Sequence, residues 1–316
     1  MSTNQSVLIA GGSRGLGLLM AREFLGLGYA VHICARDAEE LERAAVDLRR
    51  RGGTVTARVV DVRDAHAVEA WVAATYPDGT APDVALHVAG IIQVGPWDAV
   101  EPAMTDECVD TMTKGAAYLA WAIVPRMRAA GRGRIGIMSS IGGVISVPHL
   151  IPYSMAKFGA AGLAYGLQAE LSGTGVTCTA ICPPPMRTGS HLHAQFSGRP
   201  EAEYAWFAPA ASLPLASLDG TTAARRIVRA VLAGRSVVGP TPLPWLARRV
   251  FGLALGLTIG ALGLAGRLLP RGKQPPRAGL DVRDRASRTV RGLTRLGDRK
   301  ARHTNENHRS VGDPDL

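Results

Sequence analysis

Short apolar runs alternate with amphipathic stretches along residues 7–240, and this alternation limits the possible folds more than any other feature. The apolar runs have the length of buried strands, and the amphipathic stretches between them are typical of helices. Alternating strands and helices build a mainly parallel sheet with helices on both faces. We therefore predict an α/β fold of the doubly wound, Rossmann type with a seven-stranded parallel sheet.

The same pattern gives the approximate bounds of the elements. Strands are predicted at residues 7–10, 30–35, 54–59, 84–89, 134–139, 176–182 and 236–239. Helices are predicted at 15–27, 37–51, 64–75, 103–130, 153–172 and 220–233. Residues 183–218, which are rich in Pro, Ser and Ala, break the alternation; we expect a substrate lid over about 186–218, with a disordered linker as the alternative.

A glycine-rich run lies between the first predicted strand and the first predicted helix. Gly11, Gly15 and Gly17 allow a tight turn there and let backbone N–H groups approach a pyrophosphate at the helix N-terminus. The spacing differs from the G-x-G-x-x-G fingerprint, and an ordinary glycine-rich turn is the alternative. The strand–turn–helix context favours a dinucleotide-binding loop.

Two arginines near this loop indicate which dinucleotide binds. Ala35 stands at the end of the second strand, where an acidic residue would bind the ribose 2′-hydroxyl of NAD. Arg14 and Arg36 can instead hold a 2′-phosphate between two guanidinium groups. We therefore predict NADP(H), although both arginines can also be solvated surface charges and Asp37 beside Arg36 argues against the preference.

Tyr153 and Lys157 are four residues apart on one predicted helix, so their side chains point the same way. An ammonium group beside a phenol lowers the phenol pKa from its usual value near 10. Ser140, thirteen residues before the tyrosine, can hold a carbonyl oxygen at the same point. Together these groups can protonate a ketone oxygen while a nicotinamide delivers a hydride.

With these residues in place, the chain resembles the short-chain dehydrogenase/reductase family over roughly residues 5–240. Residues 10–17 are similar to the family's Thr-Gly-x-x-x-Gly-x-Gly loop, with Ala10 in place of Thr, and Asp61-Val62 is similar to the pair that contacts adenine. Ser140, Tyr153 and Lys157 match the catalytic residues. The resemblance implies cofactor contacts from Gly11, Ser13, Arg14, Gly15, Leu16, Gly17, Arg36, Asp61, Val62, Ala89, Gly90, Tyr153, Lys157, Pro183 and Thr188.

The chain departs from the family pattern at three places. His87-Val88-Ala89-Gly90 keeps only the second half of the Asn-Asn-Ala-Gly motif, and Pro184 replaces a glycine. Met112 stands where many members carry a catalytic Asn, and a thioether cannot replace an amide in holding a water near the lysine. Either the proton relay uses Thr111 or Thr113 instead, or turnover is slow.

The residues around the predicted catalytic groups favour an apolar substrate. We expect the pocket to be lined from the stretch between Ser140 and Tyr153 and from the lid, by Val144, Ile145, Val147, Leu150, Ile151, Tyr204, Trp206 and Phe207. Each of these residues can equally be plain core. The predicted function is an NADPH-dependent, reversible reductase of a hydrophobic ketone, such as a β-ketoacyl lipid, a sphingoid base precursor or a sterol.

Residues 250–266 contain no charge and have basic residues at both ends. Seventeen residues are at the short end of what spans a bilayer, and Gly252, Gly256 and Gly260 allow close helix approach in lipid. Five glycines would weaken a soluble helix by about 1 kcal/mol each, which favours a membrane role over a buried or dimer-forming helix. We assign residues 1–240 to the catalytic domain, 241–272 to this apolar segment and 273–316 to a basic, partly disordered tail, with the last dozen residues disordered.

Charge and cysteine content give the remaining expectations. Thirteen basic and six acidic residues lie from Arg267 onward, so this tail carries +7 of the net +10. Such a tail suits an anionic surface, either lipid or nucleic acid. Four cysteines without zinc spacing, together with the lack of room for a signal peptide before Val7, predict reduced thiols, no metal and a cytoplasmic enzyme on a membrane face. We also expect a homo-oligomer; a non-catalytic nucleotide sensor and a nucleic-acid-binding tail are the alternative functions.

Overall fold

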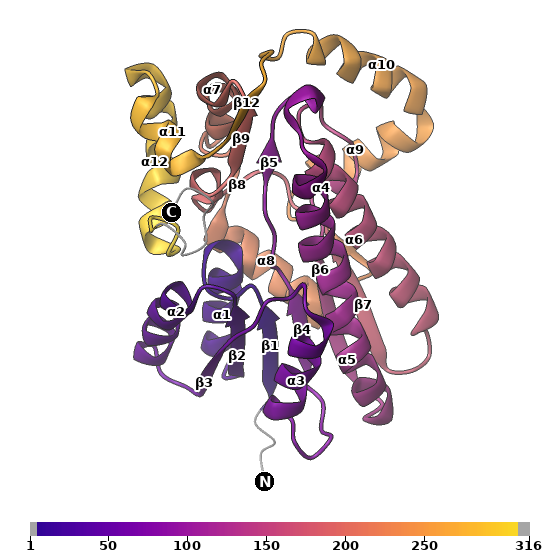
Figure 1. The fold of residues 1–316 in the computed structure, drawn as a ribbon. Helices are drawn as coiled ribbons and strands as arrows, with labels where there is room; N and C mark the ends of the chain where they lie inside the picture. Colours follow the sequence, from indigo (N-terminus) through magenta and orange to yellow (C-terminus); the bar gives the residue numbers. More distant parts are fainter. Residues whose placement is uncertain (1–4, 309–316) are drawn as a thin grey trace.

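The computed structural model describes residues 5–308 and contains the predicted seven-stranded sheet (Figure 1). The strand order is β11-β7-β6-β4-β1-β2-β3, and every neighbouring pair is parallel. The strands are β1 Ser6–Ala10, β2 Ala30–Ala35, β3 Val55–Val59, β4 Val84–His87, β6 Gly133–Met138, β7 Val176–Ile181 and β11 Val237–Val238. The order reverses between β1 and β4, which is where ligands bind in this kind of sheet. The doubly wound fold class is confirmed.

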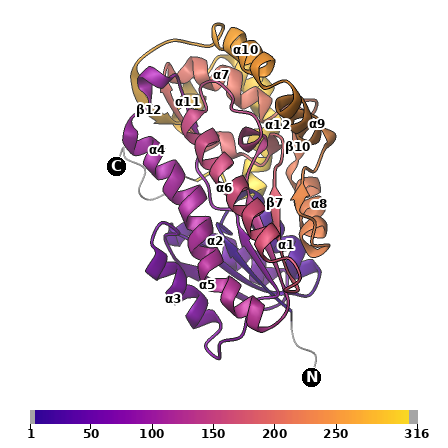
Figure 2. The ribbon, with the colours of Figure 1, turned by 90° about the vertical axis from the view of Figure 1, so that its right-hand side faces the viewer.

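Helices cover the sheet on both faces (Figures 1 and 2). One apolar core lies between the sheet and α1, α2 and α8, and a second core lies between the sheet and α3, α5 and α6. The helices are α1 Gly15–Gly26, α2 Ala38–Arg50, α3 Ala65–Thr75, α4 Pro102–Val109, α5 Gly115–Ala129, α6 Ile151–Glu170 and α8 Gly220–Leu232. Asp37 and Asp64 cap α2 and α3 by accepting hydrogen bonds from backbone N–H groups of the first turn.

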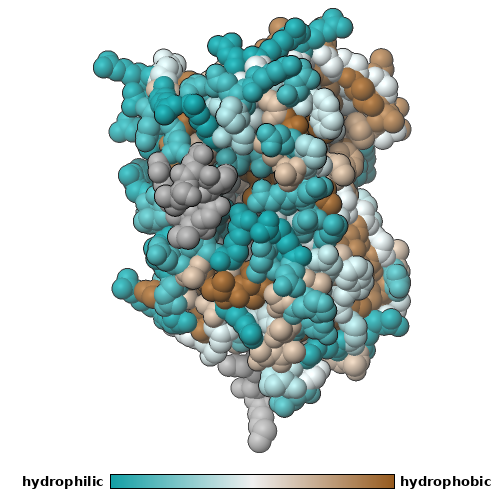
Figure 3. Space-filling model, in the orientation of Figure 1, coloured by the Kyte–Doolittle hydropathy of each residue, from teal (hydrophilic) through white to brown (hydrophobic). Residues whose placement is uncertain are grey.

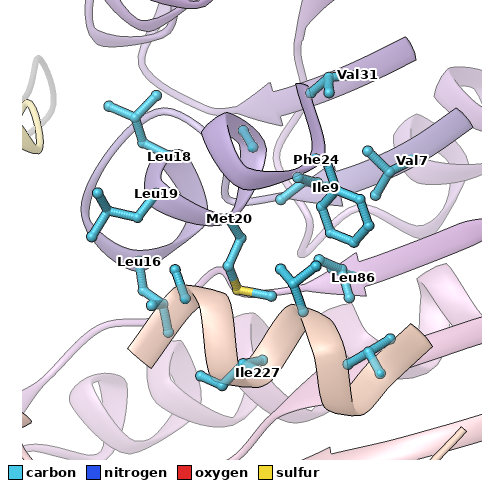
Figure 4. Packing of buried hydrophobic residues seen from close by; sticks show 14 of the residues in the cluster. Val7, Ile9, Leu16, Leu18, Leu19, Met20, Phe24, Val31, Leu86 and Ile227 are labelled. Atoms are coloured by element: carbon cyan, nitrogen blue, oxygen red, sulfur yellow. The ribbon is translucent and has the colours of Figure 1, made fainter. Parts of the chain in front are cut away.

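The first core fixes α1 against the start of the sheet (Figure 4). Met20 extends from α1 toward α8, which carries Ile227, with Ile9 and Leu86 of the strands beside it; all four side chains are fully buried. Burying such side chains stabilises the fold by about 1.5–3 kcal/mol each. This packing holds the N-terminal end of α1 at the edge where β1 ends.

The long helix predicted at 103–130 is not continuous. A π-helical turn, Asp110–Lys114, separates α4 from α5. A π turn inserts an extra residue per turn, and such turns often occur at functional sites. Met112, the residue in the expected Asn position, lies within this turn and is fully buried.

The segment predicted as a lid is folded rather than a disordered linker. It contains β8 Met186–Arg187, a 3-10 turn Ser190–Leu192, β9 Gln195–Gly198, α7 Pro200–Ala210 and β10 Leu218–Asp219. β9 pairs in parallel with β5 Gln93–Val94 and in antiparallel with β12 Gln274–Ala278. Tyr204 and Phe196 are fully buried in a separate small core, and their ring centroids lie 5.4 Å apart in an edge-to-face arrangement.

The basic region after residue 273 also has regular structure, which the sequence did not predict. After β12 come α11 Gly279–Arg285 and α12 Arg288–His303, and both helices pack on α7. Small residues on the inner face of α12 permit this contact, because a side chain at Gly297 would overlap Ser212. The dozen residues predicted as disordered begin at Asn305; of these, 305–308 are described, and 309–316 lie outside the described residues.

The apolar segment forms two helices instead of one. α9 Pro242–Leu253 and α10 Leu255–Gly266 meet at Ala254 with a bend of 113°. Among the described residues, a helix long and apolar enough to cross a membrane alone is not found, although this bent pair satisfies the same length and composition criteria together. The sequence analysis left open that this segment forms a buried packing helix. α10 is not such a helix within this chain, because none of its residues is buried.

Candidate active site

A cavity of about 320 Å³ opens at the carboxyl ends of β1, β2, β4 and β6. Its lining runs from the glycine-rich loop at one end to the predicted catalytic groups at the other. Every site residue predicted from the sequence lies in this lining: Gly11, Ser13, Arg14, Gly15, Leu16, Gly17, Arg36, Asp61, Val62, Ala89, Gly90, Ser140, Tyr153, Lys157, Pro183 and Thr188. One continuous cavity therefore joins the two motifs, which are more than 120 residues apart in the sequence.

The glycine-rich loop is shaped by two close backbone contacts. Gly11 has a φ of 86°, and a Cβ atom there would overlap the backbone of Ala89. A Cβ atom on Gly17 would overlap the carbonyl oxygen of Gly11. Only glycine permits these approaches, and they bring the N-terminal end of α1 close to the ends of β1 and β4.

Three elements bring the predicted catalytic side chains together. Ser140 follows β6, and its Oγ accepts a hydrogen bond from the backbone N–H of Gly142 at 3.1 Å. Tyr153 and Lys157 lie one turn apart on α6, and the Tyr153 hydroxyl hydrogen-bonds to Ser140. The Lys157 Nζ lies 5.7 Å from the centre of the Tyr153 ring. These contacts place a hydroxyl, a phenol and an ammonium at one point of the cavity.

The tyrosine pKa differs from the sequence expectation. Burial raises the pKa of Tyr153 to about 12, and the hydrogen bond with Ser140 opposes this rise. Lys157 is not among the groups that lower it, and its ammonium donates a hydrogen bond to the carbonyl oxygen of Met138 at 2.9 Å. The proximity of Tyr153 and Lys157 was predicted correctly, but in this structure burial has the larger effect on the phenol.

Lys157 is itself an unusual group, because it is nearly fully buried. Burial lowers its pKa to about 8 from the usual 10.5. Lysine is normally exposed, and a buried ammonium without a carboxylate partner destabilises a fold. A buried ionisable group with a strongly shifted pKa, which destabilises the folded state, is typical of functional sites.

Met112 and the two threonines proposed for the proton relay differ in their surroundings. The Met112 sulfur lies beside the lysine: a Cβ atom on Gly90 would be 3.2 Å from it and 3.5 Å from Lys157 Nζ. Thr113 Oγ1 already donates to the carbonyl oxygen of Ala156 at 2.8 Å. Thr111 lines the cavity, and its Oγ1 is buried without a hydrogen-bond partner among the described residues. Of the two threonines, only Thr111 has a hydroxyl left for another group.

The two arginines predicted to hold a 2′-phosphate both face carboxylates. Arg14 Nη1 lies 3.0 Å from Glu40 and 2.8 Å from the ring of His193. Arg36 Nη1 lies 3.3 Å from Glu107 and is half exposed. Glu40 also hydrogen-bonds to Ser13 and lines the cavity. The sequence analysis missed Glu40, because a glutamate in the first turn of a helix is an ordinary solvated residue in most chains.

The expected substrate residues divide into two groups. Val147, Leu150 and Phe207 line the cavity. Val144 and Tyr204 are buried in the cores, Ile145 and Trp206 pack against those cores, and Ile151 is exposed. Ile91 and Ile92, which the sequence analysis did not select, add apolar surface to the lining. The cavity wall near Tyr153 is therefore apolar, although fewer of the expected side chains contribute to it.

Comparison with known families shows what kind of protein has this arrangement. The family model described as short chain dehydrogenase matches residues 5–195, which is more than half of the chain. The chain belongs to the short-chain dehydrogenase/reductase family. Its departures at Met112 and Pro184 are therefore variations within that family.

Relatives of known description include reductases. Granaticin polyketide synthase putative ketoacyl reductase 1 from Streptomyces violaceoruber is 33% identical over 178 residues, which cover 56% of this chain and 65% of that relative. A crystal structure of a variant of actinorhodin polyketide ketoreductase with NADPH is 27% identical, with a TM-score of 0.66, covering 76% of this chain and 97% of that one. A short-chain dehydrogenase/reductase from Burkholderia phymatum in complex with NAD has a TM-score of 0.73 over 81% of this chain and 96% of its own; at 20% identity it shows the fold alone.

The cavity fits a nicotinamide dinucleotide of the kind that this family uses. Glycines occupy the positions in the loop where a Cβ atom would overlap neighbouring backbone atoms. The cavity extends from that loop to Ser140, Tyr153 and Lys157. The backbone N–H groups of the loop and of the α1 N-terminus suit phosphate groups. Lys157 lies at the far end beside Tyr153, and Thr188 also lines the cavity.

Replacing Lys157 with methionine should abolish catalysis and raise the melting temperature of the cofactor-free protein. The lysine pKa is about 8 when folded, below the ordinary value of 10.5, so between these two pH values the unfolded state binds more protons than the folded state. The destabilisation by the ammonium is therefore complete below pH 8 and is lost as the pH rises to 10.5. Thermal unfolding should show the variant melting a few degrees above the wild type at pH 7, with a smaller difference at pH 10. A lower melting temperature at pH 7 would show that the ammonium stabilises the fold.

Proposed function

We propose that the protein is an NADPH-dependent reductase that converts a hydrophobic ketone reversibly to an alcohol. The observation that supports this most directly is the convergence of Ser140, Tyr153 and Lys157 on a cavity whose other end is the glycine-rich loop. The relatives described as ketoacyl reductase and polyketide ketoreductase support the same reaction class. A non-catalytic nucleotide sensor is not favoured, because all three groups that proton transfer needs are present in the cavity.

Each of the three side chains has its own task. Tyr153 donates its phenolic proton to the carbonyl oxygen of the substrate. Ser140 Oγ donates a hydrogen bond to the same oxygen and polarises the carbonyl. Lys157 would hold the ribose hydroxyls of the nicotinamide nucleotide. Its ammonium, 5.7 Å from the centre of the Tyr153 ring, would favour the ionised phenol once the proton has left. The bound NADPH supplies the hydride.

Replacing Tyr153 with phenylalanine tests the general-acid role. Such groups contribute about 10²–10⁴-fold to the rate, so reduction should fall by at least 100-fold. The dissociation constant for NADPH should stay within a few-fold, because most cofactor contacts lie elsewhere in the lining. The reaction is followed by NADPH absorbance, and cofactor binding by fluorescence. Retention of more than about a tenth of the activity would show that another group supplies the proton.

Thr111 is the residue we propose for resupplying that proton. Its hydroxyl, which has no hydrogen-bond partner within residues 5–308, can hold a water near Lys157, which Met112 cannot do. Thr113 is a less suitable candidate, since its hydroxyl is already used by the Ala156 carbonyl.

The matched pair Thr111→Val and Thr113→Val separates these roles. Thr111→Val should lower kcat by about tenfold, with little loss of stability, because an isosteric side chain replaces a hydroxyl that bonds to no other described residue. Thr113→Val should cost about 0.5–1.5 kcal/mol of stability and leave kcat nearly unchanged. Steady-state kinetics and thermal unfolding of both variants give the answer. The reverse pattern in kcat would place the relay at Thr113.

The preference for NADPH rests on Arg14 and Arg36, which both line the cavity end that would hold the adenosine. A bound 2′-phosphate would replace Glu40 and Glu107 as the ion-pair partner of the two guanidinium groups. The half-exposed Arg36 can make this exchange at small cost, because its ion pair with Glu107 is near the surface.

Replacing Arg36 with aspartate should therefore shift the preference toward NADH. We expect kcat/KM for NADPH to fall by about ten- to a hundredfold, because a charge-assisted hydrogen bond is replaced by repulsion of the 2′-phosphate. The value for NADH should change much less. Equal kcat/KM for the two cofactors in the unmodified protein would contradict the preference.

The substrate that we propose is apolar and of a lipid, β-ketoacyl or sterol type. Val147, Leu150 and Phe207 support this, since they form an apolar wall around the cavity near Tyr153. Burying an apolar chain there contributes about 0.8 kcal/mol per CH₂ group. The homo-oligomer expected from the sequence stays a prediction.

We further propose that α9 and α10 hold the enzyme at the cytosolic face of a membrane. α10 has no buried residue, and Leu253 and Leu257 are more than three-quarters exposed. Apolar surface is visible at the upper right of Figure 3, where α10 lies in Figure 1. Arg248 and Arg249 precede this apolar surface, and Arg267 follows it. Because the two helices bend sharply at Ala254, we favour helices that lie in the interface over a straight span. An apolar substrate dissolved in the bilayer would then be close to the cavity.

Exposed aspartates on this surface test the membrane proposal. The double variant Leu253→Asp, Leu257→Asp should lose binding to vesicles that contain anionic lipid, while Leu215→Asp, at a fully exposed position outside the two helices, should not. Cosedimentation with vesicles at low and high salt is the measurement. Basic residues near the surface add about 1 kcal/mol each, so release of the wild type by salt alone would identify charge, not α9 and α10, as the anchor. A full chain that never sediments with vesicles would contradict the proposal.

A further inference from the structure

The segment that follows α12 lies directly against the glycine-rich loop (Figure 1). The carbonyl oxygen of Thr304 accepts a hydrogen bond from the backbone N–H of Gly15 at 2.8 Å. The Asn305 side-chain amide donates to the carbonyl oxygens of Ser13 at 3.0 Å and of Glu40 at 2.9 Å. We call residues 304–306 the docked segment. It is bound to the loop that shapes one end of the cavity.

The docked segment also contacts the opposite side of the cavity. Thr304 Oγ1 donates to the carbonyl oxygen of Thr188 at 2.5 Å. Gly189 has a φ of 92°, and a Cβ atom there would lie 3.0 Å from the Glu306 Cβ. The segment therefore connects the glycine-rich loop to the loop that carries Thr188, and both loops line the cavity.

Glu306 places a carboxylate inside the cavity. Its side chain is nearly fully buried and belongs to the cavity lining. Its Oε2 lies 3.7 Å from Arg14 Nε and 3.5 Å from His193 Nε2, and a Cβ atom on Gly15 would be 2.5 Å from its Oε1. An anion at the N-terminus of α1 beside this loop takes the place that the phosphates of a dinucleotide would need.

The buried position of the Glu306 carboxylate is energetically unfavourable. Glu306 Oε2 is buried and makes no hydrogen bond to any described residue. Burial and the nearby Glu40 raise the pKa of Glu306 to about 7, although Arg14 opposes the rise. Buried polar atoms without hydrogen bonds destabilise the arrangement that contains them. A bound dinucleotide would replace this carboxylate with phosphate groups, which can accept hydrogen bonds from the N–H groups of the loop.

We propose that residues 304–306 are an intramolecular occupant of the cofactor site, and that the dinucleotide binds only after this segment has left. The proposal rests on the cofactor site of the proposed function. Because the segment is tethered to α12, it competes at a high effective concentration and lowers the apparent affinity for the cofactor. The C-terminal region is thus an autoinhibitory element of the reductase.

Asn305→Ala in the full chain is the first test, with Asn307→Ala as its matched control. The first variant loses the two hydrogen bonds that the Asn305 amide donates to Ser13 and Glu40, and the one that its Oδ1 accepts from Arg43 at 3.3 Å. The second variant removes the same group from an exposed neighbour. We expect Asn305→Ala to bind NADPH about three- to tenfold more tightly than the wild type by fluorescence titration, and Asn307→Ala to bind it equally. A chain that ends at His303 should bind at least as tightly as Asn305→Ala, with thermal unfolding confirming that it is folded.

Hydrogen exchange gives a second measurement that is independent of activity. In the free wild type the backbone N–H of Gly15 should be protected, and residues 304–306 should exchange faster when NADPH is added. Unchanged or weaker NADPH binding in both Asn305→Ala and the shortened chain would overturn the inference, since the segment would then be neutral or part of the cofactor site. If no variant binds NADPH or NADH, the proposed function fails together with this inference.

Discussion

The close approach of Gly17 to the carbonyl of Gly11 is the contact on which the cavity depends. It allows α1 to begin immediately beside the end of β1, and the buried side chains that pack α1 against α8 hold the helix in that position. A larger residue at either glycine would push the helix N-terminus away from the ends of β1 and β4. The space for a dinucleotide therefore follows from backbone packing, and the charged side chains around it add selectivity.

At the other end of the cavity lies a group that destabilises the folded state. Lys157 is buried, its pKa is lowered to about 8, and its ammonium is held by the Met138 carbonyl at 2.9 Å. Ser140 and Tyr153 are joined by a hydrogen bond in the same place. Apolar packing in the two cores compensates for this local cost, which is the usual relation between a stable scaffold and a functional site.

Much of the fold could be predicted, because residues 7–240 follow a simple repeating physical pattern. Buried parallel strands read as apolar runs, and Asp37 and Asp64 mark helix starts by capping chemistry. The positions of Ser140, Tyr153 and Lys157 in one cavity also followed from spacing and from the family resemblance. The π turn at Met112 could not be predicted, because it depends on how the long helix packs over α6 and not on its own sequence.

The C-terminal part was the least predictable for a related reason. α12 is polar on most of its surface, and it is ordered by long-range contacts of small residues such as Gly297 with a segment about 85 residues earlier. The contacts of Asn305 and Glu306 with the glycine-rich loop join residues almost 300 positions apart. Nothing in the local sequence distinguishes such residues from an ordinary solvated tail.

The most direct test of the account is turnover of a series of apolar ketones of increasing chain length with NADPH, using the full chain. The account predicts that NADPH is consumed, that kcat/KM rises with chain length as more CH₂ groups are buried against Val147, Leu150 and Phe207, and that the activity disappears in Ser140→Ala. A protein that binds NADPH tightly and yet reduces none of these ketones would contradict the central claim that this cavity is a reductase site.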